Sequence, residues 1–177
     1  VLGRDDPGAW ALAARAQGKL VTFGKAEPEA GPGTFIKGEH LAYSDGSREI
    51  ELAPKAAFLL RGEHNLLNAL AACAIAAAAQ ISASAMSAGI SGFRGVPHRL
   101  ELVRSWRGAD WVNDSIATAP ERSMAAMRAY DEPLILLAGG RDKDLPWDEF
   151  ARLVRQRVDH LIVFGEAAHK IKNAIES

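Results

Sequence analysis

The sequence predicts an α/β protein with two domains. In the last third of the chain, helical patterns alternate with short strands, which is typical of a parallel sheet with helices packed against it. Two of these strands, residues 134–138 (LILLA) and 160–164 (ending LIVF), are almost entirely apolar, which predicts a sheet covered on both faces. Residues 92–97 (GFRGVP) interrupt every periodic pattern. We therefore expect one domain over residues 1–93 and a Rossmann-like domain over residues 94–177.

In the first domain, capping and turn signals locate the elements. Asp6 before Pro7 predicts a helix start, with proline at the first helical position, and Ser82 predicts a second helix cap. The expected elements are the end of a strand at residues 1–3, a helix over 9–17, a strand over 20–23, a loop over 27–33, a hairpin of strands 40–43 and 49–52, and helices over 64–80 and 83–89.

The second domain is expected to begin with a hairpin whose turn is Arg107-Gly108. The expected elements are strands over 100–106 and 110–112, a helix over 120–130, a strand over 134–138, a helix over 146–157, a strand over 160–164 and a helix over 166–176.

Composition argues against several classes of protein. The 177 residues are 48% hydrophobic, and 21 basic against 22 acidic residues give a net charge of −1 without a basic patch, so no nucleic-acid partner is expected. The longest apolar run, residues 69–79, is mostly alanine and about half a membrane span, so no membrane partner is expected either. The single cysteine, Cys73, cannot form an internal disulfide or a zinc site, which fits a cytoplasmic protein.

The strongest functional clue is the string WVNDSIAT at residues 111–118. It puts Asp114 and Ser115 at the end of a strand, just before a helix that opens at Pro120, where open α/β sheets bind their ligands. The alternative is that Asp114 and Ser115 only cap that helix.

Two asparagines, Asn65 and Asn68, stand three residues apart at a helix start and hence on one face. A side-chain amide offers an acceptor and two donors, which suits an adenine edge. The alternative is that one asparagine caps the helix and the other is solvated.

Two basic residues are further candidates. Arg99 stands where the first domain passes to the second, where a guanidinium can bind phosphates or form an interdomain salt bridge. Lys143 lies in the loop 139–144 (GGRDKD), whose two glycines would allow the backbone to approach a ligand. That loop could equally be a surface turn with solvated charges. His98 is expected to be structural, without a role of its own.

Four segments, in this order and spacing, resemble the second half of a Mur ligase: residues 62–68 (GEHNLLN), 95–101 (GVPHRLE), 111–118 (WVNDSIAT) and 136–144 (LLAGGRDKD). The HR-x-E and NDS-x-AT strings most resemble the branch of the family that adds D-glutamate to UDP-N-acetylmuramoyl-L-alanine. The resemblance implies that residues 1–93 are the end of the central ATPase domain and that residues 94–177 are most of the amino-acid-binding domain.

The resemblance also implies roles for six residues. Four match positions that bind ATP in the family: Asn65, Asn68, Arg99 and Asp114. Two match positions on the substrate side: Thr118 and Lys143. In the family the position of Asp114 contacts the ribose hydroxyls, and that of Lys143 contacts the carboxylate of the incoming amino acid. Ile116 departs from a common form of the family, which has lysine there.

The implied reaction transfers the γ-phosphate of ATP to the muramoyl carboxylate, and the amino group of glutamate then attacks the acyl phosphate. It requires ATP and Mg²⁺. The phosphate loop and the metal ligands would precede Val1. We therefore expect an excised fragment that has no catalytic or metal-binding residue of its own and is inactive alone. The alternatives are a Mur-type ligase for L-glutamate or another amino acid, a folylpolyglutamate synthetase relative, or a non-catalytic nucleotide-binding module.

Overall fold

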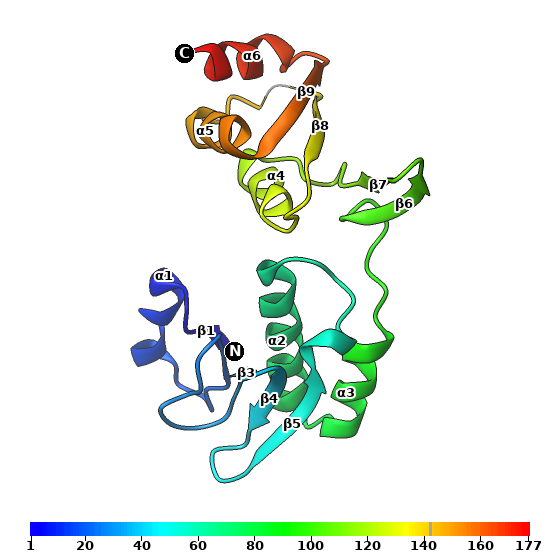
Figure 1. Cartoon of the computed structure of the whole chain (residues 1–177). Helices are drawn as coiled ribbons and strands as arrows, with labels where there is room; N and C mark the ends of the chain where they lie inside the picture. The colour runs from blue at the N-terminus through cyan, green and yellow to red at the C-terminus, as the bar shows by residue number, and fades with distance from the viewer. Residues whose placement is uncertain (142) are drawn as a thin grey trace. The chain divides into compact units, whose positions relative to one another are not determined.

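The computed structural model describes residues 1–141 and 143–177, and the chain divides into two compact units, Val1–Arg94 and Gly95–Ser177. Each unit has a hydrophobic core of its own. Figure 1 shows the elements of both units.

Unit 1 is built on a five-stranded sheet whose spatial order follows the chain (Figure 1). The strands are β1 (Leu2–Gly3), β2 (Thr22–Phe23), β3 (Gly33–Lys37), β4 (His40–Ser44) and β5 (Glu49–Pro54). The pairs β1–β2 and β2–β3 are parallel, whereas β3–β4 and β4–β5 are antiparallel. The predicted hairpin of β4 and β5 is confirmed. Its turn is held by Asp45, whose Oδ1 accepts from the backbone nitrogens of Ser47 and Arg48, both at 2.8 Å.

Strand β3 was not predicted. Its first three residues are all buried, so it lacks the alternation of polar and apolar residues that marks a half-exposed strand. The hydroxyl of Thr34, which is fully buried, donates to the backbone oxygen of Leu70 at 2.7 Å. This bond attaches the middle of the sheet to the helix packed on it.

The helical segments of unit 1 are α1 (Pro7–Trp10), the 3₁₀ turns η1 (Ala13–Arg15) and η2 (Lys55–Ala57), α2 (Glu63–Ala78) and α3 (Ala83–Gly92). The predicted start at Asp6 is confirmed, because its Oδ1 accepts from the backbone nitrogen of Ala9 at 2.9 Å. The predicted helix over residues 9–17 is wrong: α1 ends at Trp10 and only a 3₁₀ turn follows. Neither segment buries a residue, so no tertiary packing supports a longer helix. Ser82 caps α3 as predicted.

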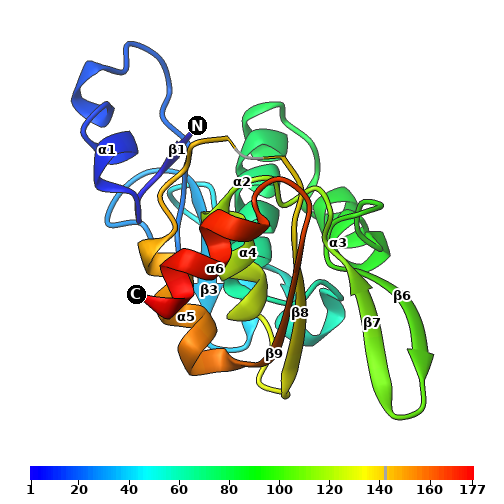
Figure 2. The same cartoon turned by 90° about the horizontal axis from the view of Figure 1, so that it is seen from above.

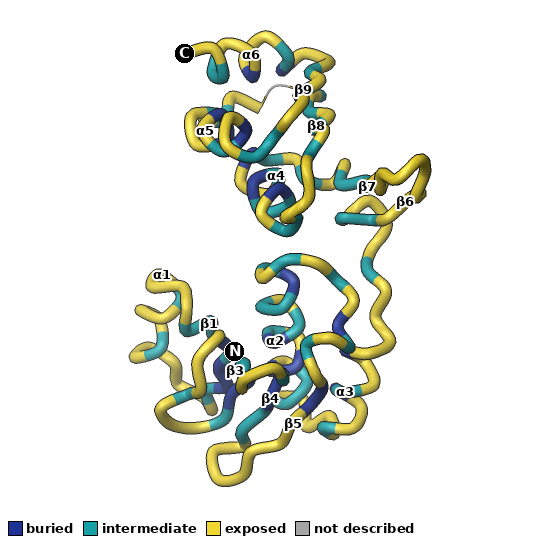
Figure 3. The backbone as a smooth tube through the Cα atoms, in the orientation of Figure 1, coloured by how far each residue is buried: buried dark blue, intermediate teal, exposed yellow. Residues whose placement is uncertain are grey.

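The core of unit 1 lies between the sheet and the helices α2 and α3. Figure 3 shows the buried residues gathered along β3, β4, β5 and the facing side of α2. The buried apolar residues of this cluster are Leu41, Leu52, Ala53, Phe58, Leu70, Cys73, Met86 and Ile90. The many alanines of α2 allow it to pack closely on the sheet. No helix in the described ranges is both long and apolar enough to span a bilayer.

Unit 2 combines a hairpin with a parallel strand pair and three helices. Its elements are β6 (Glu101–Trp106), β7 (Ala109–Asn113), α4 (Pro120–Met127), β8 (Leu134–Gly139), α5 (Asp148–Arg157), β9 (Val158–Phe164) and α6 (Ala168–Glu176). Every predicted element of this unit is present, and no end is shifted by more than three residues. The β6–β7 pair is antiparallel and the β8–β9 pair is parallel.

The prediction that the parallel sheet is covered on both faces is wrong for the residues that the structure describes. Figures 1 and 2 show α4, α5 and α6 on the same side of β8 and β9. The opposite face exposes four large apolar side chains, more than half accessible to solvent: Ile135, Leu137, Ile162 and Phe164. A short apolar run predicts a buried strand, but it cannot indicate how many faces have a helix above them.

Candidate functional site

The first candidate cluster is at the start of α2 in unit 1. Asn65 is 3% exposed; its Nδ2 donates to the backbone oxygen of Arg61 at 2.7 Å, and its Oδ1 accepts from Nδ2 of Asn68 at 3.4 Å. The cap residue is Gly62, with a φ of 93° and no side-chain hydrogen bond. The alternative that one asparagine caps the helix is therefore wrong, whereas the exposure that it gave to the other asparagine is correct for Asn68. Asn65 is turned inward and holds the turn that precedes the helix.

Asn68 is the asparagine exposed at this helix start. Because its Nδ2 faces Asn65, its Oδ1 is the atom available as an acceptor, and it makes no hydrogen bond with any described residue. An amide oxygen accepts from an exocyclic amine such as that of adenine. Nearby, Lys25 forms an ion pair with Glu63, the first residue of α2, at 2.6 Å. The hydrogen bond to Glu63 raises the pKa of Lys25.

The second cluster, in unit 2, joins the end of β7 to the residues before β6. Asp114 directly follows β7, and its Oδ1 accepts from the backbone nitrogen of Leu100 at 3.0 Å. The cap of α4 is Ala119, which makes no side-chain cap hydrogen bond. The alternative that Asp114 caps α4 is therefore wrong. Its carboxylate instead faces the segment that contains Arg99.

Arg99 is exposed and lies between two residues with left-handed backbone, His98 at φ 66° and Leu100 at φ 46°. Its backbone nitrogen donates to the oxygen of Val96 at 3.1 Å. Its guanidinium has no hydrogen bond or ion pair with any residue in the described ranges. Arg99 and Asp114 were predicted from separate strings. In the structure they lie in two segments that a hydrogen bond joins, and their side chains carry opposite charges.

Two further residues of this cluster, His98 and Asn113, were not predicted as site residues. Nδ2 of Asn113 lies 2.8 Å from Nδ1 of His98, and Oδ1 of Asn113 accepts from the backbone nitrogen of Ser115 at 3.1 Å. His98 is the first residue of the HR-x-E string, and Asn113 is the first residue of the NDS-x-AT string. Nothing in the sequence indicated that they pair with each other, because 15 positions separate them.

The remaining two predicted residues are exposed. The backbone nitrogen of Thr118 donates a hydrogen bond to the backbone oxygen of Ile116 at 2.9 Å, in the turn between Asp114 and α4. Ile116, where a lysine is common in the family, is 45% exposed. Lys143 follows the carboxyl end of β8, and its neighbour Asp142 in the predicted loop 139–144 lies outside the described residues.

The two glycines of the loop after β8 are explained by contact between strand ends. A Cβ on Gly139 would lie 2.0 Å from the backbone oxygen of Phe164, and Gly140, at φ 113°, donates to that same oxygen at 3.2 Å. Glycine is therefore needed where β8 approaches β9, whether or not a ligand binds. At the far end of the loop, Asp144 forms an ion pair with Lys170 of α6 at 2.7 Å.

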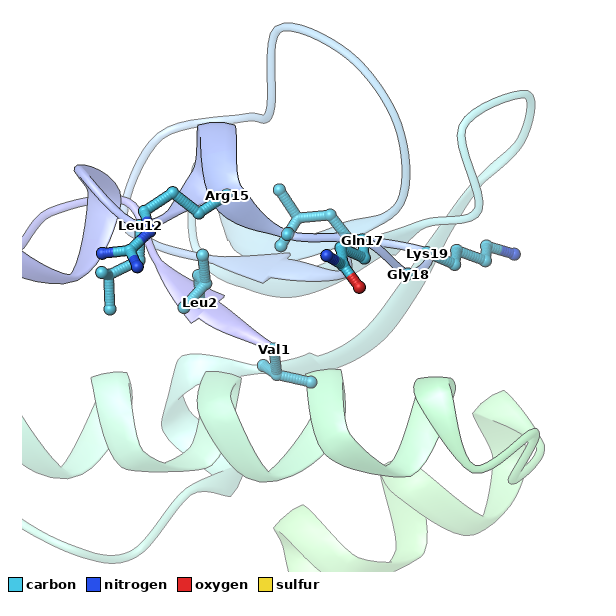
Figure 4. A pocket seen from close by; sticks show the side chains of 9 residues that line it. Val1, Leu2, Leu12, Arg15, Gln17, Gly18 and Lys19 are labelled. Carbon is cyan, nitrogen blue, oxygen red and sulfur yellow. The ribbon is translucent and has the colours of Figure 1, made fainter.

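The six predicted residues thus form an asparagine pair in unit 1 and, in unit 2, the Arg99–Asp114 cluster with Thr118 next to it and Lys143 in a separate loop. A hollow of about 370 Å³ in unit 1 (Figure 4) contains none of them; it is lined by residues 1–2, 12 and 15–20. In the part of the chain that is described, no three His, Cys, Asp or Glu side chains are grouped closely enough to hold a metal ion.

The chain is similar in sequence to known proteins of one family. Residues 98–177 match the family model "Mur ligase, glutamate ligase domain". The chain is 38% identical to the UDP-N-acetylmuramoylalanine--D-glutamate ligase of Symbiobacterium thermophilum over 176 residues, which are 99% of this chain and 39% of that protein. It is 41% identical over 149 residues to the protein of that name from Roseiflexus sp. (strain RS-1), covering 82% of this chain and 32% of that protein. The chain thus spans two fifths or less of the length of these relatives.

Solved structures resemble the fold. A pseudomurein peptide ligase type C from Methanothermus fervidus superposes with a TM-score of 0.71 at 17% identity, over 98% of this chain and 43% of that chain. MurF from Acinetobacter baumannii superposes with a TM-score of 0.63 at 16% identity, over 95% of this chain and 44% of that chain. At such identities the likeness shows the fold alone, and it agrees with the predicted α/β class.

Proposed function

This chain belongs to the Mur ligase family, and from that membership we propose that the protein containing it is an ATP-dependent ligase that adds D-glutamate to UDP-N-acetylmuramoyl-L-alanine in the cytoplasmic stage of peptidoglycan synthesis. One structural observation carries the proposal. Asp114, directly after β7, accepts from the backbone nitrogen of Leu100, so that its carboxylate faces the segment that contains Arg99. Both residues lie within the region that matches the glutamate ligase domain.

On the nucleotide side, we assign four residues to ATP. The Oδ1 of Asn68 would accept from the adenine amine, while Asn65 holds Asn68 in place. The carboxylate of Asp114 would accept hydrogen bonds from the ribose hydroxyls. Arg99 would bind phosphate oxygens, because its planar, permanently charged guanidinium can donate two parallel hydrogen bonds to them.

On the substrate side, we assign Thr118 and Lys143. The exposed ammonium of Lys143 would neutralise the carboxylate of the incoming glutamate, and the hydroxyl of Thr118 can donate to an acceptor on the same side. Lys143 follows the carboxyl end of β8, where open α/β sheets bind ligands.

In the proposed reaction an oxygen of the muramoyl carboxylate attacks the γ-phosphorus of ATP and ADP leaves. The amino group of glutamate then attacks the acyl carbon, an amide forms, and phosphate and a proton are released. Mg²⁺ would neutralise phosphate charge in the first step. We assign no residue of this chain to the metal, because no suitable group of ligands is present in the described ranges. This chain would contribute binding and orientation of ATP and glutamate.

The test is an assay of the whole protein purified from the gene that encodes this chain. Phosphate release with ATP, Mg²⁺ and UDP-N-acetylmuramoyl-L-alanine should require D-glutamate. Release with L-glutamate or another amino acid instead would identify a different Mur-type ligase. ATP binding without any turnover would leave a non-catalytic nucleotide-binding module as the function.

A further inference from the structure

The segments 98–101 and 113–116 of unit 2 are joined by three hydrogen bonds besides the strand pairing of β6 and β7. Nδ2 of Asn113 lies 2.8 Å from Nδ1 of His98, the backbone nitrogen of Ile116 donates to the oxygen of His98 at 3.2 Å, and that of Leu100 donates to Asp114 at 3.0 Å. We call this set of three bonds the latch. Its bonds join residues that are 14 to 18 positions apart in the sequence. Arg99 lies between His98 and Leu100, two of the residues that the latch holds.

The direction of the Asn113–His98 bond follows from its surroundings. Oδ1 of Asn113 already accepts from the backbone nitrogen of Ser115 at 3.1 Å, so the amide must present its Nδ2 to His98. An amide nitrogen only donates, and therefore Nδ1 of His98 accepts and the imidazole carries its proton on Nε2. Glu101, another polar side chain nearby, has its Oε2 4.0 Å from the same Nδ1, and this oxygen accepts from the backbone nitrogen of His98 at 2.7 Å.

The backbone of this segment needs such restraints. His98 and Leu100 both have positive φ, at 66° and 46°, which is unfavourable for residues with a Cβ and persists only where the surroundings enforce it. Arg99 lies between them, so its direction depends on both neighbours keeping this conformation. The latch supplies the restraint on both sides, through His98 before Arg99 and through Leu100 after it.

We propose that Asn113 is a positioning residue for nucleotide binding, acting through His98 to orient Arg99 next to Asp114. This inference rests on the function proposed above. An arginine whose backbone is already ordered loses less freedom when it binds phosphate, and that saving appears as affinity. We assign neither His98 nor Asn113 a contact with the nucleotide. In this proposal they fix the position of Arg99 relative to the carboxylate of Asp114, which binds ribose.

The experiment compares variants of the whole protein in the proposed ligase assay. Asn113→Ala removes the donor and His98→Ala removes the acceptor, so each should raise the KM for ATP about three- to tenfold, the effect of leaving one long side chain to be ordered on binding. The kcat should stay within about twofold of wild type. The double variant should be no worse than the weaker-binding single variant, because both changes break the same bond.

Two further variants separate positioning from stability. His98→Asn keeps an acceptor and tolerates left-handed backbone, so it should bring the KM for ATP back toward the wild-type value. Ser105→Ala, the matched control, removes a hydroxyl that donates to Asp110 at 2.6 Å elsewhere on the same hairpin. It should leave the KM for ATP unchanged and lower the melting temperature by less than Asn113→Ala, which removes two side-chain hydrogen bonds.

Amide hydrogen exchange of the peptide covering residues 98–101 gives a readout that does not depend on turnover, and it should accelerate in Asn113→Ala but not in Ser105→Ala. Faster exchange with an unchanged KM for ATP, or additive losses in the double variant, would overturn the positioning role while the proposed function stands. A wild-type protein that neither binds nor consumes ATP would refute the proposed function first, and the positioning role would fall with it.

Discussion

Replacing Asp114 tests the nucleotide site most directly, because the structure assigns this carboxylate a second task. Its Oδ1 accepts from the backbone nitrogen of Leu100 at 3.0 Å. Asp114→Ala removes that acceptor, which should lower the free energy of unfolding by ~1 kcal/mol, the net value of one hydrogen bond. If the carboxylate also binds ribose, ATP binding should weaken by ~1 to 3 kcal/mol, or roughly 5- to 150-fold in Kd.

Asp114→Asn is the matched variant, because its amide oxygen can still accept from Leu100 while the negative charge is lost. It should retain most of the stability that Asp114→Ala loses, yet still bind ATP more weakly than wild type. Calorimetric titration of the whole protein with ATP and urea unfolding measure the two effects separately. An unchanged Kd for ATP in Asp114→Ala, together with reduced stability, would show that Asp114 only holds the loop, and the nucleotide assignment would be wrong.

Three further predictions concern other parts of the chain. Lys143→Ala should raise the KM for D-glutamate far more than the KM for ATP, whereas Lys172→Ala on α6 should change neither. A larger increase in the KM for ATP than in that for D-glutamate would contradict the assignment of Lys143 to glutamate. Phe150 is 1% exposed and packs edge-to-face on Trp147, with 5.2 Å between the two ring centroids. Phe150→Ala should therefore lower the free energy of unfolding, measured with urea, by ~3 to 5 kcal/mol, and Phe150→Leu should lower it by less. Burial raises the pKa of the Cys73 thiol to about 11. Since an unfolded thiol has a pKa of about 8.5, stability should fall between these pH values more steeply in wild type than in Cys73→Ala, and equal slopes would contradict the burial effect.

The features that the sequence by itself determined are those whose signals come from neighbouring residues. The Asp6 cap, the turn at residues 44–47 and the Arg107-Gly108 hairpin each rest on a few consecutive side chains, and all three are present in the structure. The alternation of strands and helices in unit 2 was also predictable, because apolar runs and helical spacing are local patterns. The strings around Arg99 and Asp114 likewise identified the family from the chain alone.

The remaining features depend on partners far apart in the chain, and only the tertiary structure decided them. Strand β3 is held by a bond from Thr34 to a residue 36 positions later, and no local pattern marks it. Asp114 faces Leu100 rather than the helix that follows it, because folding brings the backbone nitrogen of Leu100, 14 positions earlier, within reach of its carboxylate. The uncovered face of β8 and β9 has the same origin: the apolar residues are in the sequence, but the side on which the helices pack is a property of the folded chain.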